Sequence, residues 1–130
     1  MSQHLENQGL GSPEPPVVLA NFRRASYLTA RTRARYAALA ERAAFTGLLG
    51  PGMAAEPVRG AYGVAPPLGD LIRKEWDVIV VTPHFTGALV ATDQLTTLPE
   101  LERRFTFMVT YDRDLVLEAA RSLLARICPP

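Results

Sequence analysis

The pattern of apolar and polar positions is most regular near the end of the chain, where it predicts a strand followed directly by a helix. Residues 105–109 are aromatic, β-branched or long apolar types that suit a pleated strand. In the helix that follows, the apolar side chains fall within an arc of about 160°, and charged residues face the other way. These apolar residues are Val116, Leu117, Ala119, Ala120, Leu123, Leu124 and Ile127. Asp112 is expected to cap this helix, because its carboxylate can accept hydrogen bonds from the free amides of the first turn.

Two further apolar runs, residues 17–22 and 45–49, predict strands on either side of an earlier helix. The first run is apolar on both faces, which is typical of an interior strand. Ser26 or Thr29 can cap a helix that continues to about residue 44. Three arginines on this helix fall within about 40° of one another: Arg31, Arg35 and Arg42. This arginine row is either a solvated face or a docking surface for an acidic partner or a phosphate.

Residues 76–82 and 86–92 predict two more strands, and the short connection between them makes an antiparallel hairpin. The segment 50–70 is rich in proline and glycine, and a loop of this length is either a functional lid or binding loop, or disordered. Residues 1–15 are polar and rich in proline, as in a flexible leader or linker, which leaves 16–128 as a single domain. The elements together predict an α/β fold: a single mixed sheet of about five strands with an antiparallel hairpin, packed by two main helices.

Composition and charge limit the classes of function. The 130 residues carry a net charge of +1, so there is no electrostatic reason to expect direct nucleic-acid binding. A single cysteine, Cys128, excludes an internal disulfide framework and fits a reducing compartment. No apolar run reaches the roughly 18 residues that a membrane span needs, and residues 1–16 do not resemble a signal peptide. We therefore expect a cytoplasmic protein without a membrane partner.

Residues that could carry chemistry are few. His4, His84 and Cys128 are not spaced as metal ligands or as a nucleophile with its base, so we expect no catalytic site, no metal and no enzyme activity, and no cofactor can be assigned. Side chains at the ends of predicted strands, and one in the loop 50–70, could line a ligand pocket or be ordinary core and turn residues. These candidates are Tyr62, Trp76, His84, Phe85, Tyr111 and Arg113. Leu115 lies off the apolar arc of the last helix and joins the arginine row as a candidate partner surface.

Three segments carry a resemblance to a known family: residues 15–22, 75–93 (EWDVIVVTPHFTGALVATD) and 103–127 (RRFTFMVTYDRDLVLEAARSLLARI). They resemble the DICT sensory domain, a bacterial module associated with diguanylate cyclases and two-component systems, over roughly residues 15–127. The strongest part is the Asp112-Arg-Asp-Leu-Val start and the Ala-Ala-Arg-Ser-Leu end of the last helix. The resemblance implies a sensory or regulatory module without catalysis of its own, in a family for which a link to light responses or transcription has been proposed.

This resemblance leads to two hypotheses of function. In the first, the domain binds a small ligand in a pocket between the sheet and the loop 50–70, and passes a signal to an output protein. In the second, it is a protein–protein interaction or dimerisation module, with a homodimer as one form, and has no small-molecule site. Because no cyclase, kinase or DNA-binding domain accompanies it in this sequence, it is expected either to act through a separate partner or to be a fragment of a longer protein.

Overall fold

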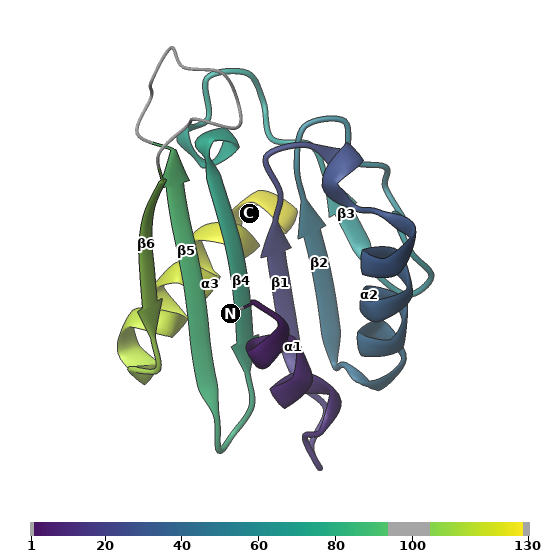
Figure 1. Ribbon diagram of the computed structural model, residues 1–130, viewed down its shortest axis with the longest axis vertical. Coiled ribbons are helices and arrows are strands. Elements are labelled where there is room, and N and C mark those ends of the chain that lie inside the picture. Colours follow the sequence, from purple (N-terminus) through teal and green to yellow (C-terminus); the bar gives the residue numbers. More distant parts are fainter. Residues whose placement is uncertain (1, 94–104, 129–130) are drawn as a thin grey trace.

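A six-stranded mixed sheet with helices on both faces forms the domain (Figure 1). The computed structural model describes residues 2–93 and 105–128. The strands are β1 (Val17–Asn21), β2 (Phe45–Leu49), β3 (Tyr62–Val64), β4 (Glu75–Val81), β5 (Thr86–Asp93) and β6 (Phe105–Thr110). The helices are α1 (Ser2–Leu10), α2 (Ala30–Arg42) and α3 (Arg113–Ile127), with the short 3-10 helices η1 (Ala25–Tyr27) and η2 (Leu71–Lys74). The predicted α/β class is confirmed, with six strands in place of about five.

The sheet has the strand order β3-β2-β1-β4-β5-β6. Strands β1, β2 and β3 are parallel, whereas β4, β5 and β6 pair antiparallel with their neighbours. The predicted hairpin is confirmed as β4 and β5, whose last register pair is Val81 with Thr86. Thr82 closes the turn, because its Oγ1 accepts a hydrogen bond of 2.8 Å from the amide of Phe85. The sheet therefore changes from parallel to antiparallel pairing between β1 and β4.

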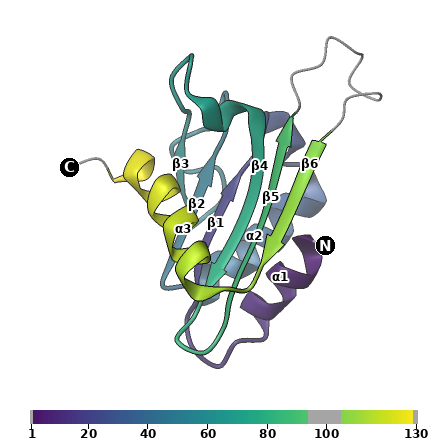
Figure 2. The ribbon, with the colours of Figure 1, turned by 90° about the vertical axis from the view of Figure 1, so that its left-hand side faces the viewer.

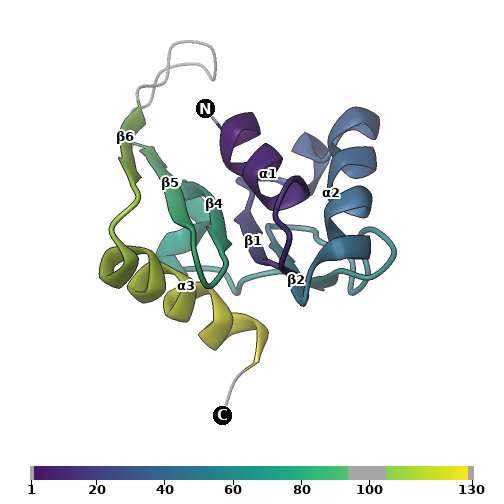
Figure 3. The same ribbon diagram turned by 90° about the horizontal axis from the view of Figure 1, so that it is seen from below.

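Helices α1 and α2 cover one face of the sheet, and α3 crosses the other face (Figures 2 and 3). Successive side chains of β1 alternate between the two cores: Val18 and Ala20 pack with α2, and Leu19 packs with α3. A strand with an apolar layer on each side must be apolar on both faces, which explains the composition of this run. The predicted caps are also present, since Thr29 accepts from the amide of Thr32, and Asp112 caps α3.

The N-terminal segment differs from its prediction. Residues 1–15 were expected to be a flexible leader, but Ser2–Leu10 form α1, which packs on the sheet. Leu5 is buried against Val78, Val80 and Leu89. The expectation is wrong because it weighed local composition alone, whereas α1 is held by contacts to residues far along the chain.

The segment 50–70 was expected to be a functional lid or binding loop, or disordered, and the structure shows an ordered segment of which three residues form a strand. It contains β3, which extends the parallel edge by pairing with β2. Before β3, the side chains of Met53, Val58 and Ala61 are buried in the core beneath α2. The segment therefore forms an edge of the domain. Of the helices that the structure describes, none is both long and apolar enough to cross a membrane.

Candidate functional site

A buried polar pair lies where the sheet changes from parallel to antiparallel pairing. Asn21, the last residue of β1, is directly opposite Asp77 of β4. Asn21 is 0% and Asp77 3% exposed. Both share a face with Leu19 and Ile79, because side chains two residues apart on a strand point the same way, and this face is the one that α3 covers. The pair therefore lies at the carboxyl end of β1, a place where open α/β sheets commonly bind ligands.

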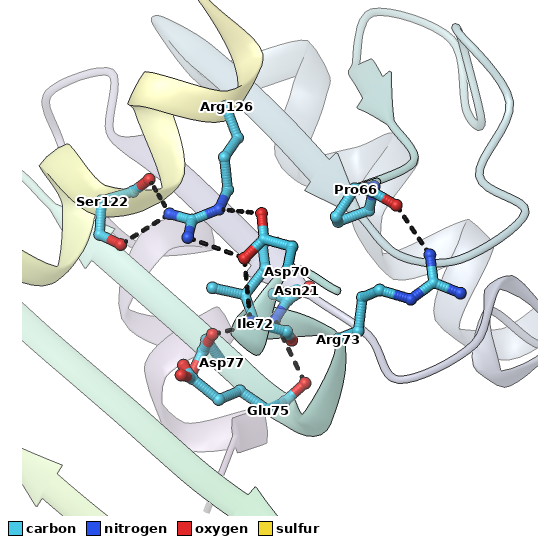
Figure 4. Close-up of polar contacts among 9 residues, drawn as sticks. All are labelled: Asn21, Pro66, Asp70, Ile72, Arg73, Glu75, Asp77, Ser122 and Arg126. Carbon is cyan, nitrogen blue, oxygen red and sulfur yellow. Dashed lines mark hydrogen bonds and ion pairs between the residues drawn. The ribbon is translucent and has the colours of Figure 1, made fainter. Parts of the chain in front are cut away.

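Asn21 connects β1 to the start of β4 through its side-chain amide (Figure 4). Its Nδ2 lies 2.8 Å from the carbonyl oxygen of Ile72, 3.2 Å from that of Glu75, and 3.1 Å from Oδ2 of Asp77, so these three acceptors share its two N–H donors. The other oxygens of the pair, Asn21 Oδ1 and Asp77 Oδ1, are buried and have no hydrogen-bond partner among the described residues. Most buried polar atoms in proteins are paired, so two neighbouring exceptions mark this place as unusual.

Burial sets the protonation of this pair. Removal from water, and next the negative charge of Glu75, raise the pKa of Asp77 to about 8. The hydrogen bond from Asn21 and the positive charge of Arg126 act in the opposite direction and are weaker. Asp77 is therefore mostly protonated at neutral pH. A carboxyl group whose pKa lies this close to neutrality changes charge within the physiological range, which is a common property of functional sites.

An ion pair joins this region to the last turn of α3 (Figure 4). The guanidinium of Arg126 binds both carboxylate oxygens of Asp70, with Nε 2.7 Å from Oδ2 and Nη2 2.9 Å from Oδ1. Nη1 of Arg126 also donates to the carbonyl oxygen of Ser122, 2.6 Å away, one turn earlier in α3. Asp70 caps η2 by accepting from the amide of Ile72, and the bond from Arg126 lowers the pKa of Asp70. The pair thus fastens α3 to the segment that leads into β4.

Sequence reasoning did not single out Asn21, Asp70, Asp77 or Arg126. The signal that could have found them is the presence of one polar residue within each of two apolar strand runs, at Asn21 and Asp77. Within the described ranges, no group of three or more histidine, cysteine or acidic side chains is arranged to hold a metal ion.

Four of the six predicted ligand residues lie at the opposite end of the sheet, around the β4–β5 turn and the start of α3. The rings of Phe85 and Tyr111 meet edge to face, with centroids 6.0 Å apart. Nη1 of Arg113 donates to the carbonyl oxygen of Thr82 at 3.1 Å. His84 is exposed in the turn, with Nε2 3.4 Å from a carboxylate oxygen of Glu14.

The remaining two predicted ligand residues lie elsewhere. Trp76 is half-buried between the cores beneath α1 and α2. Tyr62 is exposed on the edge strand β3, where its ring stacks on Phe45 with centroids 5.3 Å apart. A surface hollow is lined by Ala37, Ala40, Glu41, Arg59 and Gly60, and it contains none of the six. The six residues therefore lie at separate places on the described part of the chain, and their role in ligand binding stays a prediction.

The arginine row of α2 contacts the N-terminal segment of the same chain. Nη1 of Arg35 forms an ion pair of 2.8 Å with the buried carboxylate of Glu6 in α1. Nη2 of Arg42 donates to the carbonyl oxygen of Ser12 at 3.1 Å. Arg31 is exposed. The acidic group that Arg35 binds is therefore internal, and a docking role for Arg31 and Arg42 stays a prediction.

Comparison with known proteins identifies the family. The sequence model of the sensory domain in diguanylate cyclases and two-component systems, DICT, matches residues 1–94, which is 94 of the 130 residues. This range contains α1 to β5 and ends before β6 and α3, although the sequence resemblance was strongest in α3. No curated protein and no solved structure matches the chain. The chain belongs to the DICT family of sensory domains.

Proposed function

We propose that this chain is a non-catalytic, cytoplasmic regulatory module that recognises an output protein through the end of the sheet where α3 begins. Its membership of a sensory family supports the signalling role. The observation that carries the choice of surface is the exposure of three large apolar side chains between residues 108 and 115. Met108 is 49%, Tyr111 53% and Leu115 49% exposed.

The chemistry around these side chains resembles that of protein interfaces. Exposed methionine and tyrosine with a neighbouring arginine are enriched at such interfaces, and Arg113 supplies the arginine here. Phe85 of the β4–β5 turn contacts Tyr111, but it is half-buried and packs on the core beneath α1. We call Met108, Tyr111 and Leu115 the α3-start patch. Single exposed apolar residues are ordinary in soluble proteins, but a group within one short segment needs an explanation.

Site-specific cross-linking in the cells that make the protein tests the proposal. A photoreactive phenylalanine analogue is placed at Tyr111, and in a matched control at Tyr62, an exposed tyrosine on the opposite edge of the sheet. We expect one signalling protein to be cross-linked from position 111 and not from 62, and the yield to fall when Leu115→Ser is added. Equal products from both positions, or no loss with Leu115→Ser, would contradict the proposed surface.

Native mass spectrometry of the purified protein, together with its absorption spectrum, separates this proposal from two others. A mass matching one bare chain of 14.2 kDa agrees with a separate output protein. A mass of two bare chains would favour a homodimerisation module. An added mass, or absorbance beyond the aromatic band, would instead establish a small ligand and move the recognition site away from the α3-start patch.

A further inference from the structure

Arg126 interacts with acidic side chains on two different segments. It is hydrogen-bonded to Asp70, in the segment before β4. It also interacts through charge with Glu75 and with the buried Asp77, both on β4. A guanidinium is always charged and presents several donors in one plane, so it can bond either of two carboxylates within its reach.

The loss of the proton from Asp77 would favour a change from one carboxylate to the other. Oδ1 of Asp77 and Oδ1 of Asn21 are neighbouring buried oxygens without a described donor. A protonated Asp77 contributes an O–H donor of its own, so fewer buried oxygens are left without a donor. An ionised Asp77 contributes only acceptors and adds a charge inside an apolar layer, which is costly unless a cation reaches it. The positively charged group that acts on Asp77 is Arg126.

Among the described groups that shift the pKa of Asp77, the cation is Arg126, and the cationic residues of η2, Arg73 and Lys74, are not among them. On its own strand, Glu75 raises this pKa through its negative charge and through a side-chain hydrogen bond. Across the sheet, β1 presents the uncharged Asn21 and β5 presents Val90 at the paired position. Among the described groups that shift the pKa of Asp77, the positive charge comes from α3.

We propose that Arg126 is a two-position switch that bonds Asp70 while Asp77 carries a proton and moves toward Asp77 and Glu75 when that proton is lost. The move breaks both hydrogen bonds to Asp70, so the segment before β4 loses its fastening to α3. Because Asp70 caps η2, this 3-10 helix loosens as well. The last turn of α3 and residues 70–74 thereby report the protonation of a buried acid. The switch lies at the other end of α3 from the α3-start patch and does not depend on it.

A carbon-detected NMR titration of the wild-type protein from pH 5.5 to 10 tests the switch. We expect the side-chain carboxyl carbon of Asp77 to titrate near its pKa of about 8. The guanidinium carbon of Arg126 and the backbone carbonyls of residues 70–74 should move with the same midpoint. If Asp77 titrates while Arg126 and residues 70–74 do not respond, or if Asp77 does not titrate in this range, the proposal is wrong.

Variants separate the switch from a general effect of pH. In Asp77→Asn the side chain keeps its shape and cannot ionise, so the common midpoint should disappear from Arg126 and residues 70–74. In Asp70→Asn, Arg126 should still follow Asp77, whereas the carbonyls of residues 70, 71, 73 and 74 should no longer respond. The carbonyl of Ile72 is left out of this comparison because it accepts from Asn21, which also bonds Asp77. Glu118→Gln, on the exposed side of α3, is the matched control and should titrate as the wild type does. A midpoint that persists in Asp77→Asn overturns the proposal, and the wild-type titration decides the matter if this variant does not fold.

Discussion

The hydroxyl of Tyr36 donates a hydrogen bond of 2.6 Å to Oε2 of Glu6, and this contact fastens α1 to α2 in the interior of the protein. Both residues are buried, and the other carboxylate oxygen of Glu6 accepts from Arg35. Burial, and next the charge of Glu6, raise the pKa of Tyr36 well above its ordinary value, so the hydroxyl keeps its proton and remains a donor. The charge of Glu6 is thus compensated by two groups of a single helix.

Removal of this hydroxyl is expected to destabilise the domain. Tyr36→Phe keeps the ring that packs edge to face on Phe22, 5.9 Å away, but leaves Glu6 without one of its two donors. Hydrogen bonds to a charged group contribute about 1.5–3 kcal/mol, so the free energy of unfolding in urea should fall by about 2 kcal/mol. Tyr62→Phe, at the exposed sheet edge, should change it by less than about 0.5 kcal/mol. Equal effects of the two changes would show that Glu6 does not need Tyr36.

Two glycines of the sheet each allow one helix to pack closely on it. A Cβ added to Gly87 of β5 would lie 2.5 Å from Leu5 Cδ2 of α1, and one added to Gly47 of β2 would collide with Ile127 Cδ1 of α3. Gly87→Ala should therefore lower hydrogen-exchange protection in residues 2–10, and Gly47→Ala should lower it in residues 122–128. Each variant is the control for the other. Loss of protection in both helices with either change would mean that the helices are not seated independently.

The elements that sequence reasoning predicted are those whose signals are local. α3 combines a capping residue, Asp112, with an apolar arc that recurs every three or four positions, and Val116, Ala120 and Leu123 of that arc are buried. The β4–β5 hairpin needed only two apolar runs and a short turn. In both cases the residues that determine the element lie within it, so the pattern along the chain was sufficient.

The elements that it missed depend on distant contacts. α1 has few apolar residues, and its buried Glu6 is compensated by residues 29 and 30 positions away. β3 has three residues, one of them a glycine, and is ordered by parallel pairing with β2. Asn21 and Asp77 are 56 residues apart, so nothing along the chain shows that they are paired. Tyr111 was named from sequence because it borders a predicted strand and helix, and Leu115 because it lies off the apolar arc. Met108 was not named, and Tyr62 and Trp76 fell on other parts of the sheet.

The N-terminal cap of α3 is expected to contribute to the stability of the domain. Asp112 accepts a hydrogen bond of 3.1 Å from the amide of Leu115, one of the donors that the first turn cannot satisfy itself. Asp112→Ala should lower the free energy of unfolding by about 1 kcal/mol. Asp114→Ala is the control, because this neighbouring acid favours the helix dipole without serving as the cap, and its loss should cost about half as much or less. An Asp112→Ala variant as stable as the wild type would contradict the capping role.

The two acids near Arg126 should affect stability in opposite directions as pH changes. Asp70 has a pKa below its ordinary 3.8 in the folded protein, so its contribution is present above pH 3.8 and is lost as pH falls through its folded value. The pKa of Asp77 is raised from 3.8 to about 8, so the folded protein binds the extra proton between these values. Over that window the stability contributed by Asp77 falls as pH rises, and above it the loss is complete.

Melting temperatures of three proteins from pH 2 to 9 check these signs. Asp77→Asn removes the ionisable group, so its melting temperature relative to the wild type should rise steadily between pH 4 and 8 and then level off, because the wild type alone must keep a proton on a buried acid. Asp70→Asn should melt below the wild type at pH 6, with a difference that shrinks toward acid pH as the carboxylate of the wild type becomes protonated. A constant offset for Asp77→Asn across this range would mean that Asp77 ionises in the folded protein as readily as in the unfolded chain. The burial described above would then not control its charge.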